Sequence, residues 1–197
     1  MTYILKSLRD NKDGTLSATV ILDDGDTQKK KHITVAAEDY SEAGSPVPGD
    51  VLYTEDYHIL IRKSDADAAR ERAYAIMAAG DNSANGLYRK LLQRGFQKES
   101  AENAVAHMLA KGFIRESEQL SRFVVTLANT RLYGKRRITA ILISKGYRRE
   151  DIDRAIADAT GNGDVNFSDV KRRLAESRFT ADMTDEEKRG ILFRYGF

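Results

Sequence analysis

A six-residue pattern returns about every fifty residues along this chain. Its copies read LLQRGF, LISKGY and LFRYGF, and their glycines are Gly95, Gly146 and Gly196. Recurrence at a fixed period in this range predicts one supersecondary unit stacked on copies of itself. Such an array presents a long surface to a large partner rather than a pocket to a small substrate.

Apolar residues recur in step with the three glycines. Two sets at matching distances before the glycines are Ala73, Val124, Leu174 and Ala69, Leu120, Val170. We therefore predict a mainly α, elongated array of three tandem three-helix repeats, over residues 65–112, 113–161 and 162–197. The third repeat is truncated because the sequence ends at Phe197, so we expect its last pair of helices to be less covered.

Each glycine of the pattern is expected to end a helix. Glycine adopts the positive φ that stops a helix without the strain that a side chain would add. The aromatic residue after each glycine then folds back onto the helix. In the first repeat one apolar helix face is expected to comprise Ala101, Ala104, Val105, Met108 and Leu109, and Gly112 to end that helix. This interpretation gives the glycines no function beyond ending helices.

The first fifty residues have a different pattern. Short β-prone segments lie at 3–5, 16–22 and 32–35, and turn-forming residues separate them. Alternating apolar residues within 16–22 predict a half-buried strand. We therefore predict a small β-rich segment over 1–50, folded as a hairpin or as a three-stranded meander.

A boundary is expected where both prolines occur, within 44–49. Residues 51–64 would then form a linker or a short helix. We favour the helix, with Thr54 as its cap, over a last strand at 58–61.

The composition limits the class of protein. The 197 residues carry a formal net charge of +2 and include no cysteine, which excludes disulfides and thiolate metal sites. No apolar run approaches the roughly 20 residues that span a bilayer. The chain reaches Lys6 too early for a signal peptide. We expect a cytoplasmic protein that is monomeric and has no membrane contact.

A group of basic residues stands out because acidic residues are scarce around it. Seven basic residues and no acidic one lie between Thr130 and Arg149, and a second basic run follows at 171–173. This set, called here the basic strip, comprises Arg131, Lys135, Arg136, Arg137, Lys145, Arg148, Arg149, Lys171, Arg172 and Arg173. Tyr133 and Tyr147 flank its first part.

The basic strip has three interpretations. Basic residues with interleaved aromatics bind phosphates and stack on bases. They also meet acidic grooves on proteins. The third interpretation is a solvated helix face without a partner.

No motif in the sequence predicts catalysis. His32, His58 and His107 lie far apart and lack the spacing of metal ligands. The run Asp23–Asp26 predicts a hairpin turn, because no calcium loop with a closing glutamate follows it. There is no phosphate-binding loop and no dinucleotide fingerprint. We expect no enzyme activity, no cofactor, no bound metal and no small-molecule substrate.

The chain resembles the RecX family over about residues 65–197. The most recognisable family segment is Gly-Lys, a basic residue and Ile, followed by Leu and Lys-Gly. It matches 134–138, Leu142 and 145–147. A second signature matches at Ser83, Leu87, Lys90 and Leu91.

Two positions depart from the family pattern. Gly86 stands where the second signature has a glutamate, which removes half of a capping box, so we expect a frayed helix start. A third signature, at 113–116, keeps its apolar pair but only one of two acids. Some members carry a leading β-containing segment, which would account for 1–50.

RecX proteins regulate the RecA recombinase, and the resemblance implies the same role here. It implies that the partner is the RecA nucleoprotein filament, with 135–137, Arg148 and Arg149 as the first candidate contacts in its groove. Bound there, the protein would inhibit the recombinase, ATPase and coprotease activities in DNA repair, recombination and the SOS response. One alternative is a helical module that binds DNA directly through the basic strip. Another is a scaffold for an unrelated protein.

Overall fold

The structure is a computed structural model that describes all residues, Met1–Phe197, and it divides into two compact units. The first, called here the sheet unit, comprises Met1–Ala75 and Leu91–His107. The second, the helical unit, comprises Ile76–Lys90 and Met108–Phe197.

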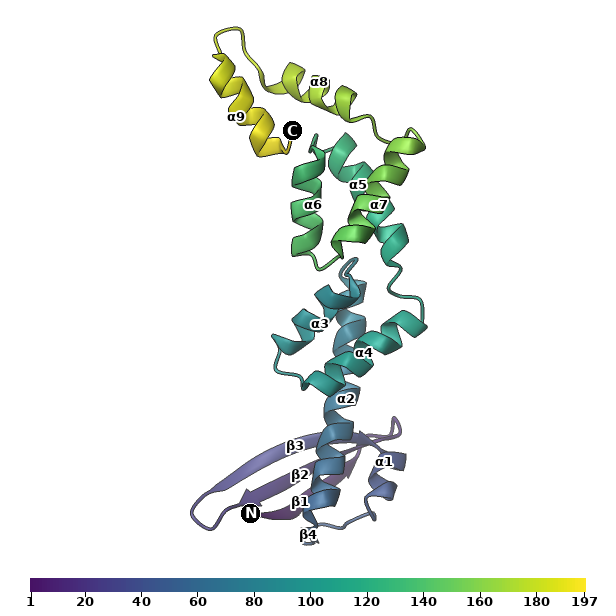
Figure 1. The fold of residues 1–197 in the computed structure, drawn as a ribbon. Coiled ribbons are helices and arrows are strands. Elements are labelled where there is room, and N and C mark those ends of the chain that lie inside the picture. Colours follow the sequence, from purple (N-terminus) through teal and green to yellow (C-terminus); the bar gives the residue numbers. More distant parts are fainter. The chain divides into compact units, whose positions relative to one another are not determined.

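Four strands form one antiparallel sheet in the sheet unit (Figure 1). They are β1 (Thr2–Asp10), β2 (Thr15–Asp23), β3 (Gln28–Ala36) and β4 (Val51–Leu52), in the spatial order β3-β2-β1-β4. The predicted meander of three strands is confirmed, and the short β4 pairs with the free side of β1. A bulge between Leu5 and Ser7 shifts the register of β1 against β2.

One face of the sheet is covered by helices α1 (Ala37–Glu42) and α2 (Thr54–Ala78). Leu5, Val20 and Val35 of the strands are buried in one cluster with Tyr40 of α1 and Leu60 of α2. A single covered face is usual for an antiparallel sheet. The lysines at 29–31 are exposed on the edge strand β3, where charge disfavours pairing with another chain.

Helix α2 begins at Thr54 and continues to Ala78. The helix favoured for this segment is therefore present and the alternative of a strand at 58–61 is wrong, but the helix is longer than the short one expected and continues through the predicted boundary at residue 65. Glu55 and Asp56 lie in the first turn, where negative charge stabilises the positive end of the helix dipole.

Seven more helices follow, so the chain is mainly helical (Figure 1). They are α3 (Ala84–Leu92), α4 (Lys98–Ala110), α5 (Glu116–Asn129), α6 (Lys135–Ser144), α7 (Arg149–Gly161), α8 (Phe167–Arg178) and α9 (Asp185–Tyr195). None of the helices is both long enough and apolar enough to cross a membrane. The division of these helices into three repeats stays a prediction.

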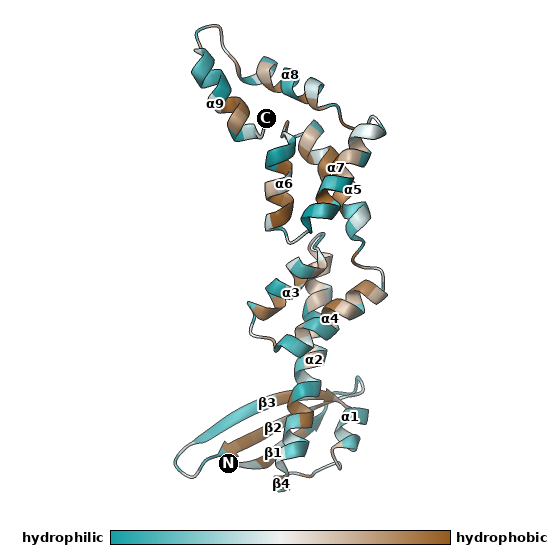
Figure 2. Ribbon diagram, viewed as in Figure 1, coloured by the Kyte–Doolittle hydropathy of each residue, from teal (hydrophilic) through white to brown (hydrophobic).

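The core of the helical unit lies between α5, α6 and α7. Leu120, Val124, Ile138, Leu142 and Ile152 are almost completely buried there. In Figure 2, α6 is hydrophilic at its start and hydrophobic toward its end. Of the last two helices, which were expected to be less covered, α9 has no buried residue, whereas α8 buries Val170 and Leu174.

The apolar face predicted for α4 is confirmed with one exception. Ala101, Ala104, Val105 and Met108 are buried, but Leu109 is 47% exposed. The periodicity placed Leu109 on this face, but it lies one residue beyond Met108, the last buried position, and so falls at the edge of the core.

The three glycines of the repeated pattern end their helices as predicted. Gly95, Gly146 and Gly196 have φ values of 88°, 95° and 93°. In each case the N–H of the following aromatic residue donates to the carbonyl of the first leucine of the pattern, at 2.9 to 3.3 Å. The aromatic residue thus folds back onto the helix that has just ended.

Two of these glycines also lie where another helix begins. A Cβ on Gly146 would lie 2.8 Å from the backbone nitrogen of Gly86 in α3, and a Cβ on Gly196 would collide with the backbone nitrogen of Arg137 in α6. The neighbouring hydrogen bonds are also alike. The Ser83 hydroxyl donates to the carbonyl of Lys145, and the Gly134 N–H donates to the carbonyl of Tyr195. These glycines therefore have a packing role in addition to ending helices.

The frayed start expected for α3 is not observed. Ser83 Oγ accepts a hydrogen bond from the Gly86 N–H at 2.9 Å, and the Glu116 carboxylate accepts one from the Ala84 N–H at 2.7 Å. A glutamate from α5 therefore compensates for the one missing at position 86. The absence of a side chain at Gly86 is itself required, because a Cβ there would lie 2.6 Å from the carbonyl oxygen of Lys145.

Candidate partner-binding surface

The basic strip lies on the exposed surface of the helical unit. Helix α6 carries Lys135, Arg136 and Arg137 in its first turn, and Lys145 is its C-cap. Arg148 and Arg149 begin α7, residues 171–173 lie on α8, and Arg131 precedes α6. All ten side chains are exposed.

The charges at the start of α6 oppose the dipole of their own helix. The N-terminus of a helix is its positive end, and each basic residue there is destabilising by about 0.3–1 kcal/mol. Helices α5, α7, α8 and α9 all carry acidic residues in the first turn, whereas α6 carries none. Its N-cap, Gly134, also provides no side-chain hydrogen bond. Helix stability therefore does not explain why three cations occur here.

The cations of α6 lie over aromatic rings rather than beside carboxylates. Lys135 Nζ is 5.3 Å from the ring centre of Phe167, and Lys145 Nζ is 5.3 Å from that of Phe123. The Arg137 guanidinium lies 5.6 Å from the ring of Tyr133. A ring orients a cation without neutralising it, so these charges remain available to an anionic partner.

Arg136 has a structural task as well. Its guanidinium lies 4.0 Å from the ring centre of Phe193 and donates to the Phe193 carbonyl oxygen at 2.7 Å. The Gly134 N–H donates to the carbonyl of Tyr195 next to it. Arg136 therefore holds the last turn of α9 against the start of α6.

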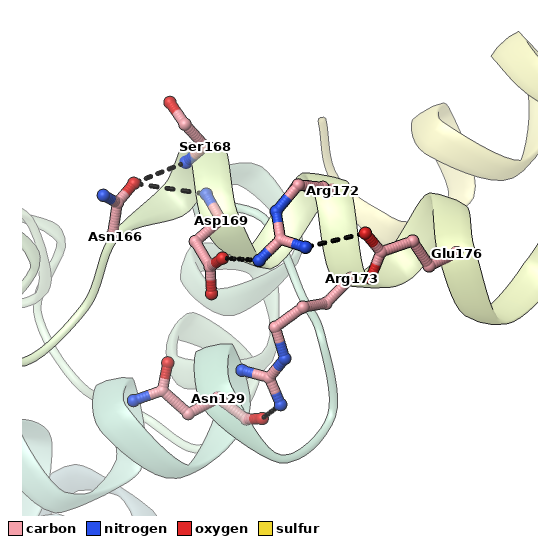
Figure 3. A network of polar contacts seen from close by, with 7 residues as sticks. All are labelled: Asn129, Asn166, Ser168, Asp169, Arg172, Arg173 and Glu176. Atoms are coloured by element: carbon pink, nitrogen blue, oxygen red, sulfur yellow. Dashed lines mark hydrogen bonds and ion pairs between the residues drawn. The ribbon is translucent and has the colours of Figure 1, made fainter.

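Two cations of the strip, Arg149 on α7 and Arg172 on α8, are already paired with carboxylates. Arg149 pairs with Asp153 at 2.8 Å. Arg172 lies between Asp169 and Glu176, which together raise the pKa of its guanidinium (Figure 3). Arg173 donates to the backbone carbonyl of Asn129 at 3.1 Å (Figure 3), a contact that leaves its positive charge without an acidic partner. Of the ten cations, only Arg149 and Arg172 have ion-pair partners, and Lys135–Arg137 at the start of α6 are three consecutive cations without one.

A groove of about 450 Å³ separates α6 from α9. Its lining residues are Arg136, Arg137, Ala140, Gly190, Phe193, Arg194 and Gly196. Phe193 and Arg194 lie in the third copy of the repeated pattern, but neither was among the candidate contact residues predicted from the sequence.

Tyr147, which flanks the basic strip in sequence, is not available to a partner. It is 4% exposed and donates to Gln119 Oε1 at 2.7 Å within the core. Tyr133 is partly exposed and contacts Arg137 and Tyr195. Of the two tyrosines, only Tyr133 belongs to the candidate surface.

The three histidines do not form a site. His32 Nδ1 lies 3.0 Å from the Thr19 hydroxyl, and His107 Nε2 lies 2.7 Å from the Tyr74 hydroxyl. No three histidine, aspartate or glutamate side chains are grouped so that they could hold a metal ion. Asp24 accepts hydrogen bonds from the Thr27 backbone and side chain, which lower the pKa of its carboxyl as expected in a hairpin turn.

Comparison with known proteins gives one consistent result. Regulatory protein RecX of Pseudomonas fluorescens strain Pf-5 is 33% identical over 128 residues, which cover 65% of this chain and 82% of that protein. Regulatory protein RecX of Pseudomonas syringae pv. tomato is 29% identical over the same length and coverage. No family model matches the chain.

Solved structures agree in fold. The crystal structure of a regulatory protein RecX superposes with a TM-score of 0.66 at 17% identity, covering 99% of this chain and 94% of that one. RecX from Lactobacillus salivarius gives a TM-score of 0.54, covering 68% of this chain and 88% of that one.

Proposed function

Because the chain belongs to the RecX family, whose members are named regulatory proteins, we propose that it binds the RecA–DNA filament and inhibits RecA. The affected activities are strand exchange, ATP hydrolysis and the coprotease activity. The observation that carries the proposal is the run of three cations without ion-pair partners in the first turn of α6, which is present although it opposes the dipole of that helix.

The basic strip fits a groove with negative charge. Lys135 and Arg137 are exposed, lie over rings and have no carboxylate partner, so they can meet acidic side chains or phosphates without first breaking an ion pair. Several such contacts along one surface would favour a filament of many subunits over a single free subunit. Occupying the groove would then hinder DNA exchange and ATP turnover.

The test is DNA-dependent ATP hydrolysis by RecA with this protein titrated in below one copy per RecA. Inhibition at those ratios supports binding to the filament or to its ends. No effect even at excess would contradict the proposed function.

The contact surface needs a variant that spares α9. Replacing all of 135–137 would also remove the Arg136 bond that holds α9, so the informative variant is Lys135→Gln with Arg137→Gln. The matched control, Arg122→Gln with Arg154→Gln, removes the same number of charges from ion-paired positions outside the basic strip. We expect the α6 variant to need about tenfold more protein for half-inhibition, because two charge-assisted contacts are lost, and the control to behave like the original chain. Equal behaviour of the two variants would contradict the assignment to α6.

A further inference from the structure

The groove between α6 and α9 combines guanidinium groups with an exposed aromatic ring. Arg136 and Arg137 line it from α6, and Arg194 lines it from α9. No carboxylate lines the groove, and Arg194 has no ion-pair partner. Phe193, on the same helix, is 67% exposed.

We propose that this groove binds single-stranded nucleic acid. Arg137 and Arg194 contact successive phosphates, and an unpaired base stacks on Phe193. The proposal goes beyond the regulation of RecA, since the ligand is the strand itself and the binding is measured with no recombinase present.

The exposed ring favours a nucleic acid strand over an acidic protein segment. Guanidinium groups bind phosphates and carboxylates alike, so charge alone does not separate the two. A phenyl ring exposed in a helix without any buried residue serves no core, whereas base stacking uses such a ring and tolerates any base sequence.

The surroundings of Phe193 prepare the ring for stacking. Arg136 lies 4.0 Å from the ring centre and also binds the Phe193 carbonyl, so the ring is held while most of it remains exposed. Gly190 contributes no side chain to the groove, and a Cβ there would meet no atom within 4 Å. A flat base therefore has room beside the ring.

The chain contains no tryptophan, so Phe193→Trp introduces a single fluorescent reporter in the groove. Adding oligothymidylate should quench its emission in a saturable way, because stacking on a base quenches an indole. Tyr53→Trp is the matched control at an exposed position of the sheet unit, 81% exposed in the original chain. Its emission should stay unchanged.

Two further variants separate stacking from charge. Phe193→Ala should weaken oligothymidylate binding roughly 5- to 150-fold at every salt concentration, the range for loss of one stacked base. Arg194→Gln should lower the slope of log affinity against log salt by about 0.7, the value for one phosphate contact on a single strand. The control Arg154→Gln, which removes a charge paired with Asp151 on α7, should leave the slope unchanged.

Three results would overturn the proposal. One is oligothymidylate binding that leaves the emission of the Phe193→Trp variant unchanged. Another is the absence of binding even at low salt. The third is equal quenching by polyglutamate, which would assign the groove to an acidic protein segment. Each variant should unfold at the melting temperature of the original chain. Phe193→Trp should also retain the oligothymidylate binding that Phe193→Ala loses, which separates loss of stacking from displacement of α9. Because RecA is absent throughout, failure here leaves the proposal of RecA inhibition standing.

Discussion

Gly146 and Gly163 both have positive φ, but only Gly146 lies against another helix. A Cβ on Gly163 would meet no atom within 4 Å, whereas one on Gly146 would lie 2.8 Å from both the Gly86 nitrogen and Ser83 Oγ. Glycine is therefore favoured at position 163 by the positive φ alone, and at position 146 by both the positive φ and the close packing against α3.

This difference predicts two distinct losses of stability. Gly163→Ala should lower the free energy of unfolding by about 1–2 kcal/mol, the strain of the left-handed conformation. Gly146→Ala should lose a further 1–3 kcal/mol or so, because the added carbon overpacks the contact with α3. Urea denaturation of both variants measures the difference, and equal losses would contradict the packing role.

Tyr147 links the stability of the core to pH. Burial, and to a lesser degree the nearby acidic charges, raise the pKa of its hydroxyl above the usual value. The folded chain then keeps this proton above about pH 10, while the unfolded chain releases it. Because the unfolded state binds fewer protons in that range, stability falls as the pH rises.

Replacing Tyr147 with phenylalanine tests this link. The variant should lose about 1–3 kcal/mol at neutral pH, because Gln119 Oε1 loses its buried donor. Its free energy of unfolding should then fall less steeply than that of the original chain between about pH 9 and pH 11. Tyr40 and Tyr57, whose pKa values burial also raises, are present in both chains and do not affect the comparison.

Among the elements, α6 places charge in conflict with helix stability. Its first turn holds three cations and no acid, and its N-cap provides no side-chain bond. If these cations serve partner binding rather than folding, replacing them should weaken RecA inhibition without lowering the stability of the fold.

Lys135→Glu should therefore weaken RecA inhibition without lowering the melting temperature. Removing one positive charge and adding one negative charge near the N-terminus are each worth about 0.3–1 kcal/mol. The lost contact with the Phe167 ring offsets about 0.5–1 kcal/mol of that gain. Lys135→Gln should be intermediate in both measurements. A clear drop in melting temperature for Lys135→Glu would mean that the lysine supports the fold.

On the scale of the whole molecule, the chain has two units with separate cores. One core lies between the sheet and α2, with Leu5 fully buried, and the other lies among α5, α6 and α7, with Leu142 fully buried. The basic strip belongs entirely to the helical unit.

Separate cores predict separate responses to a cavity. Leu5→Ala should destabilise the sheet unit by about 2–5 kcal/mol, and Leu142→Ala should destabilise the helical unit by a similar amount. Hydrogen exchange should accelerate around each substitution while the core of the other unit stays protected. Uniform acceleration of hydrogen exchange by either variant would indicate one cooperative unit. Because the basic strip belongs to the helical unit, RecA inhibition should be more sensitive to Leu142→Ala than to Leu5→Ala.

The sequence alone determined features that depend on neighbouring residues. Positive φ at Gly95, Gly146 and Gly196 and the strands before residue 37 are local properties of the chain, so short patterns predicted them. The family resemblance was also visible, because it rests on the order of residues. The ion pairs of Arg149 and Arg172 were not predicted, although their partners lie three or four residues away on the same helix.

Only the tertiary structure decided features that join residues distant in the sequence. Arg136 donates to a carbonyl 57 residues away and Ser83 to one 62 residues away. Glu116 caps the start of α3 by accepting from the backbone N–H of Ala84, 32 residues before it. The periodicity of apolar residues in the sequence does not predict such pairs, because they depend on how complete helices pack against one another. For the same reason the exposure of Phe193, and with it the groove beside α6, could be found only once α9 was placed.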